Sequence, residues 1–180
     1  MSKRNLSSMK FIKTVVHLYT GEGAGKTTSV FGVALRTVGH GKKAVIIQFM
    51  KGRKDIGEYK IQKKLRNYHV YQAGSRSFID FKHPKPDDYR RAKEGIELAE
   101  RLLRKKPDLL VLDELGLAAA RGLVGIEDVL GLLRKVPAKT HTYITGRENP
   151  KEFFRIATFV TQLKTLKEPK KPEYIKGIEY

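Results

Sequence analysis

Thr20-Gly21-Glu22-Gly23-Ala24-Gly25-Lys26-Thr27-Thr28 is the most informative stretch of this sequence, because three alternating glycines lead into a Lys-Thr pair. An apolar run, residues 14–19, precedes it, and a helix-like stretch, residues 29–38, follows it. Strand, glycine-rich turn and helix form the context of a phosphate-binding loop. The alternative, a glycine-rich hairpin with a chance Lys-Thr pair, does not account for that context.

The residue types of this loop suit a bound nucleotide. Glycines allow a tight turn with positive φ, and their amides can face phosphate oxygens at the positive end of the following helix. Lys26 would contact the terminal phosphates, and the Thr27 hydroxyl would bind Mg²⁺. Thr20 stands where the usual pattern has its first glycine, which here comes one place late. The predicted nucleotide-binding residues are Gly21, Glu22, Gly23, Ala24, Gly25, Lys26, Thr27 and Thr28.

The order of elements predicts the fold class. A strand at 11–19, a helix at 27–38 capped by Gly39, and a strand at 43–50 make a parallel βαβ unit. Further strands are expected at 69–72, 109–112, 140–145 and 159–166, and further helices at 57–65, 87–105, 125–135 and 150–157, the last with Asn149 as N-cap. This alternation predicts one domain over residues 1–180, a three-layer α/β, P-loop NTPase-like (RecA-like) fold with a mostly parallel sheet.

Composition narrows the possible functions. The chain carries a net charge of +18. It contains no cysteine, and this absence excludes disulfides and thiolate metal sites. No apolar run is long enough to span a bilayer, and residues 1–10, a mobile arm, lack the apolar core of a signal peptide. We therefore expect a cytoplasmic protein, with a basic C-terminal tail at 167–180. The basic charge suits a nucleotide; the lysines mostly stand singly, which favours a solvated surface over a nucleic-acid footprint.

Three further features follow predicted strands or lie in a long loop. Asp113-Glu114 directly follows the buried strand 109–112, where an acidic residue holds Mg²⁺ or, alternatively, caps a helix. Arg147, in Thr145-Gly146-Arg147, could bind phosphates in a bidentate manner or form a surface salt bridge. Phe78 lies in the long loop 73–86, and such loops are often binding loops.

Beyond these features, the chain resembles the P-loop corrinoid adenosyltransferases, also called cob(I)alamin adenosyltransferases. The resemblance covers nearly the whole chain in family order, and the late first glycine is the family's own variant. The matching stretches are 20–28, Phe31-Gly32-Val33-Ala34-Leu35-Arg36, Gly39-His40-Gly41-Lys42, Gln48-Phe49-Met50-Lys51-Gly52, Leu112-Asp113-Glu114, Thr145-Gly146-Arg147 and Lys176-Gly177-Ile178-Glu179-Tyr180.

The resemblance implies transfer of the 5′-deoxyadenosyl group of ATP to the Co(I) of a reduced corrinoid, with triphosphate as the leaving group. It implies catalytic roles for Lys26, Arg147 and Glu114, and a Mg²⁺ site at Thr27 and Glu114 with Asp113 in support. It also implies that Phe78 binds the corrinoid, that the protein is a homodimer, and that an unidentified electron donor reduces the cobalt.

Two other functions fit parts of the sequence. One is a P-loop kinase of the thymidine-kinase type, although the absence of cysteine argues against its zinc-bearing forms. The other is an ATP-dependent nucleic-acid-binding module, suggested by the charge alone. The chain also departs from the family pattern at Glu22 and Ala24, where relatives often have Asn and Lys, and at Ile79, near a tryptophan of some members. The preferred corrinoid, cobalamin or a precursor, stays open.

Overall fold

The computed structural model describes residues 12–171, 173 and 175–178. The predicted arm at 1–10, the start of the first strand at Phe11, and Glu179 and Tyr180 lie outside the described residues. Among the described helices, none combines the length and apolar character that crossing a bilayer requires.

The centre of the fold is a parallel sheet of six strands in the described part of the chain, in the order β3-β2-β4-β5-β1-β6. Every pairing between neighbours is parallel, so the expected mostly parallel sheet is parallel throughout. The strands are β1 (Val15–Thr20), β2 (Ala44–Phe49), β3 (Tyr68–Ala73), β4 (Leu109–Asp113), β5 (His141–Thr145) and β6 (Phe159–Gln162).

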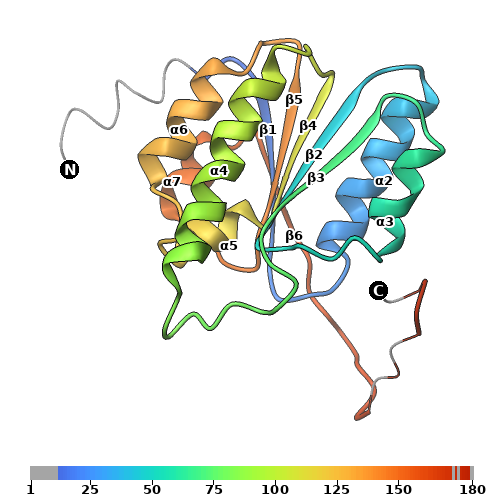
Figure 1. The fold of residues 1–180 in the computed structure, drawn as a ribbon, viewed down its shortest axis with the longest axis vertical. Coiled ribbons are helices and arrows are strands. Elements are labelled where there is room, and N and C mark those ends of the chain that lie inside the picture. Colours follow the sequence, from blue (N-terminus) through green and yellow to red (C-terminus); the bar gives the residue numbers. More distant parts are fainter. Residues whose placement is uncertain (1–11, 172, 174, 179–180) are drawn as a thin grey trace.

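Helices cover both faces of this sheet and make the predicted three layers (Figure 1). Helices α2 and α3 lie on one face, and α4, α5, α6 and α7 lie on the other (Figure 1). Their bounds are α2 (Lys26–Gly39), α3 (Gly57–Lys60), which continues into a 3₁₀ turn (Ile61–Lys63), α4 (Pro86–Leu103), α5 (Leu115–Ala120), α6 (Ile126–Lys135) and α7 (Lys151–Ile156).

The two central strands, β2 and β4, are buried along their whole length. Successive side chains of a strand point to opposite faces, so a strand covered on both sides needs apolar residues at every position. Alternate residues accordingly belong to two cores: Val45 and Ile47 pack under α4 and α6, whereas Ala44 and Ile46 pack under α2. The apolar runs 44–47 and 109–112 therefore locate the middle of the sheet.

All six strands run in one direction, so their carboxyl ends meet at a single edge. The loop 21–25 leaves β1 there, Asp113 and Glu114 end β4 there, and residues 145–147 end β5 there. Open α/β sheets bind ligands at this edge. The fold thus brings the predicted phosphate loop and both predicted strand-end clusters to one place.

Some predicted boundaries and caps were wrong. Asn149 is not the N-cap of α7; Pro150 is, because the Asn149 side-chain amide donates instead to Thr20 Oγ1 at 3.0 Å and to the Gly146 carbonyl at 2.8 Å. Gly39 is the last residue of α2, and the left-handed residue that follows is Gly41, with φ of 71°. The last strand ends at Gln162, earlier than predicted.

Candidate active site

The glycine-rich loop joins β1 to α2, as predicted. Gly21 and Gly25 both have φ of 96°, which L-residues rarely adopt, and Gly25 is the N-cap of α2. Gly23 is different: its φ is not positive, and its amide donates to the Leu163 carbonyl at 3.0 Å. The expectation that all three glycine amides face a phosphate is therefore wrong for Gly23.

The segment that follows β6 packs against this loop. A Cβ on Gly21 would lie 2.3 Å from the Leu163 carbonyl oxygen, and one on Gly23 would lie 2.7 Å from the Leu163 carbonyl carbon. The Leu163 amide in turn donates to the Thr20 carbonyl at 2.9 Å. Two of the glycines are thus required by the close approach of another backbone, and the C-terminal part of the chain supports the loop.

Lys26 begins α2 and folds over its own loop. Its ammonium donates to the carbonyls of Gly21 at 2.5 Å and Gly23 at 2.7 Å. Burial lowers the pKa of Lys26, against the attraction of Glu114. The ammonium consequently lies at the loop, where a phosphate chain held by the loop would meet it.

Asp113 is the centre of a buried hydrogen-bond network. Its Oδ1 accepts from the hydroxyls of Thr27 at 3.0 Å and Thr145 at 2.8 Å, and its Oδ2 accepts from Gln48 Nε2 at 3.2 Å and Lys51 Nζ at 2.8 Å. A carboxylate offers about four lone-pair positions, so these four donors fill them. Burial alone would raise the pKa of Asp113, but the Lys51 ammonium and the hydrogen bonds outweigh it and lower that pKa.

Glu114 contrasts with its neighbour. Its backbone is left-handed, with φ of 61°, and its amide donates to Thr145 Oγ1 at 2.8 Å. Its Oε2 is buried without a hydrogen-bond partner, and burial together with the charge of Asp113 raises its pKa. Glu114 occupies the N-cap position of α5, yet its side chain makes no capping hydrogen bond, so helix capping does not explain this acidic pair. A strained backbone and an unpartnered carboxylate at a strand end are typical of a ligand site.

A cavity of about 310 Å³ opens beside Glu114. Arg147 and the exposed Phe78 both line it, and Arg147 forms an ion pair with Glu22 at 3.9 Å. Phe78 is 104% exposed, so it is not a core aromatic that supports the loop from beneath. The cavity is lined by Phe49, Met50, Lys51, Phe78, Ile79, Phe81, Glu114, Leu117, Arg121 and Arg147.

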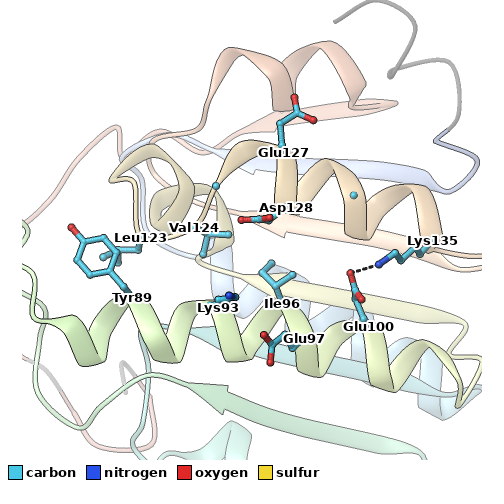
Figure 2. Close-up of a pocket in the computed structure, with 12 residues that line it drawn as sticks. Tyr89, Lys93, Ile96, Glu97, Glu100, Leu123, Val124, Glu127, Asp128 and Lys135 are labelled. Atoms are coloured by element: carbon cyan, nitrogen blue, oxygen red, sulfur yellow. Dashed lines mark hydrogen bonds and ion pairs between the residues drawn. The ribbon is translucent and has the colours of Figure 1, made fainter. Parts of the chain in front are cut away.

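A second hollow, of about 410 Å³, lies between α4 and α6 (Figure 2). Ile96 lies in its floor, Glu97 and Asp128 flank it, and Glu100 pairs with Lys135 at 2.7 Å (Figure 2). None of the predicted site residues lines it. The predicted site residues therefore lie away from this hollow.

Sequence reasoning gave no individual role to three members of the Asp113 network: Gln48, Lys51 and Thr145. Gln48 and Lys51 stand in the stretch 48–52, which was noted only as one of the stretches that match the family. The position of Gln48 could have indicated its role, because a polar residue inside a fully buried strand needs a hydrogen-bond partner there.

The parallel sheet, the glycine loop at the start of α2 and the buried acidic residue ending β4 define a P-loop NTPase-like nucleotide-binding protein. Comparison with known proteins narrows this class. Residues 12–180 match the family described as ATP:corrinoid adenosyltransferase BtuR/CobO/CobP, and the chain belongs to this family.

Individual relatives agree with the family match. The chain is 31% identical over 170 residues to the corrinoid adenosyltransferase of Pseudomonas aeruginosa, covering 92% of this chain and 83% of the relative. It is 32% identical over 155 residues to that of Escherichia coli K12, covering 85% and 78%. It is 26% identical over 178 residues to that of a Sinorhizobium species, covering 94% and 83%. The resemblance inferred from the sequence motifs is confirmed.

Proposed function

We propose that this protein transfers the 5′-deoxyadenosyl group of ATP to the Co(I) of a reduced corrinoid. Co(I) donates an electron pair to C5′ of the ribose, the C5′–O bond breaks, and triphosphate leaves with the bonding pair. The observation that carries the proposal is the shared cavity: Glu114 and Arg147, beside the phosphate loop, line it together with the exposed Phe78. Triphosphate and corrinoid would thus occupy adjoining parts of one site.

The protein itself needs neither a nucleophile nor a water-activating base, because the substrate's cobalt attacks. Its task is to orient C5′ towards cobalt and to stabilise charge that develops on the triphosphate. The loop 21–28, apart from the Gly23 amide, would hold the phosphates, with Lys26 at the loop and Arg147 at the cavity wall. The ion pair of Arg147 with Glu22 is exposed and weak, so a phosphate can replace the carboxylate as its partner.

Mg²⁺ fits the donor set at the phosphate end. The Thr27 hydroxyl and the unpartnered Glu114 carboxylate are oxygen ligands of the kind that Mg²⁺ prefers. Asp113 supports them from behind, since its four hydrogen-bonding positions are occupied and it holds Thr27 in place. A bound Mg²⁺ supplies positive charge to the leaving triphosphate. The described residues contain no cluster of three His, Cys, Asp or Glu side chains suited to a metal, so a Mg²⁺ ion here would depend on the bound phosphates for further oxygen ligands.

The corrinoid would lie against Phe78, which presses on the lower face of the ring and eases reduction of cobalt. Ile79 and Phe81 extend the same apolar wall. By analogy with the family, the protein acts in the cytoplasm as a homodimer, and an electron donor still to be identified reduces the cobalt of the corrinoid to Co(I). A direct role in nucleic-acid binding is not part of this proposal.

The proposal is tested by incubating the protein with ATP, Mg²⁺ and chemically reduced cobalamin. The corrinoid absorption spectrum should change to that of the adenosylated form, and triphosphate should accumulate in equal amount. Lys26→Ala should abolish both signals. ADP or orthophosphate as the main product, with an unaltered corrinoid, would instead indicate a kinase or hydrolase.

A further inference from the structure

Lys51 lies at the phosphate end of the site. Its ammonium donates to Thr27 Oγ1 at 3.1 Å and to Asp113 Oδ2 at 2.8 Å. The Lys51 side chain is 32% exposed, whereas that of Asp113 is fully buried. The ammonium therefore occupies the position of a cation between the loop hydroxyl and the strand-end carboxylate.

A metal ion bound to Thr27 would use the same hydroxyl oxygen as this ammonium. Mg²⁺ lies about 2.1 Å from its oxygen ligands, so an ion on Thr27 Oγ1 would come within about 4–5 Å of an ammonium 3.1 Å from the same atom. Two positive charges at that separation repel each other strongly in a partly buried site. Mg²⁺ and the Lys51 ammonium therefore compete for the Thr27 hydroxyl oxygen.

The backbone around Lys51 is in contact with the loop that carries Phe78. A Cβ on Gly74 would lie 2.2 Å from the Met50 carbonyl carbon, and one on Gly52 would lie 2.6 Å from the Ser75 carbonyl carbon. Met50, with φ of 61°, also donates its amide to the Ala73 carbonyl at 3.0 Å. This close backbone packing and the Met50 hydrogen bond join the turn 50–52 to the start of the loop.

We propose that Lys51 is a positioning residue that couples the phosphate end of the site to the Phe78 loop. The Lys51 ammonium stays on Thr27 and Asp113 until Mg²⁺ bound to ATP displaces it. Displacement of the ammonium then shifts the turn 50–52 together with the Phe78 loop. Nucleotide binding thereby prepares the corrinoid side of the cavity. This inference rests on the proposed function, since it takes Mg²⁺–ATP as the ligand.

The first test measures ATP affinity by calorimetry with excess Mg²⁺ and again with EDTA. The dissociation constant of ATP in EDTA, divided by that in excess Mg²⁺, reports how much Mg²⁺ strengthens ATP binding. In Lys51→Met this ratio should rise about tenfold, because the competing hydrogen-bonded charge is gone. The exposed Lys54→Met in the same connection is the matched control and should leave the ratio unchanged. An unchanged or smaller ratio in Lys51→Met would overturn the competition, and a merely structural role for Lys51 predicts no increase.

The second test uses the absence of tryptophan from the chain. Phe78→Trp places the chain's one tryptophan on the loop, and its emission can be excited apart from that of the tyrosines. Its emission should shift with Mg²⁺ and ATP but not with ATP and EDTA, and Lys51→Met should remove that difference. If Lys51→Met does not fold, Phe78→Trp alone decides, since emission insensitive to Mg²⁺ during measured ATP binding refutes the coupling. Absence of ATP binding under both conditions would refute the proposed function as well.

Discussion

Gly21→Ala tests the claim that the C-terminal segment shapes the phosphate loop. The new methyl group would lie 2.3 Å from the Leu163 carbonyl oxygen, at a backbone φ of 96°. A left-handed alanine costs about 1–2 kcal/mol. Moving Leu163 aside also breaks its two backbone hydrogen bonds to the loop, to Gly23 and Thr20, at about 0.5–1.5 kcal/mol each. The free energy of unfolding should therefore fall by about 2–5 kcal/mol.

Gly41→Ala is the matched control. Gly41 also has positive φ, at 71°, but a Cβ there meets nothing within 4 Å. Gly41→Ala should lower the free energy of unfolding only by the cost of a left-handed alanine, about 1–2 kcal/mol, and leave ATP affinity unchanged. Urea unfolding followed by circular dichroism gives the stabilities, and calorimetry gives the affinities. We expect ATP affinity to fall at least about tenfold in Gly21→Ala. Equal effects of the two substitutions would refute the role assigned to Leu163.

Three other substitutions test separate parts of the structure. Phe78→Ala should leave stability unchanged, because the side chain is fully exposed, and should slow turnover mainly when Co(II) must be reduced on the enzyme; equal loss with pre-formed Co(I) contradicts this. Asp113→Asn leaves the Lys51 ammonium without its buried carboxylate partner and should lower the free energy of unfolding by about 3–5 kcal/mol in urea titrations. Asp55→Asn is the control, because Asp55 is exposed and its loss should have little effect on stability. Burial and a neighbouring histidine lower the pKa of His17 from 6.5, so the unfolded chain binds the proton more readily and stability falls as the pH drops through 6.5. His17→Phe should reduce that loss between about pH 7.5 and about pH 5.5, and an unchanged pH dependence would be the contrary result.

The sheet was predictable because burial imposes a strong pattern on its strands. The runs 44–47 and 109–112 are apolar at every position, as strands covered on both faces require. Helix α5 was not predicted, because its sequence, Leu-Gly-Leu-Ala-Ala-Ala, is almost entirely buried and shows no polar face. Its existence depends on tertiary packing that a periodicity argument does not include.

The site was predictable in its residue types but not in its connections. Thr27 comes from the start of α2, whereas Asp113 and Glu114 come from the end of β4. The loop before α2 and this acidic pair both follow parallel strands, which sufficed to group them. The contact of Lys51 with Thr27 joins residues 24 positions apart, and the left-handed Met50 beside Lys51 was not indicated by the sequence. The contact of Leu163 with Gly23 joins residues far apart in sequence, and no local signal marks it.

That contact also sets an order of assembly during synthesis. The phosphate loop is translated early, but Leu163, which supports it, follows β6 and is translated after β1 to β5. Because chains emerge from the ribosome N-terminus first, the inner strands can pair while the loop still lacks Leu163. A nascent chain that has not yet released β6 would therefore carry a sheet without a finished nucleotide site. Capture of ATP by such a chain waits until the residues around 163 have been synthesised.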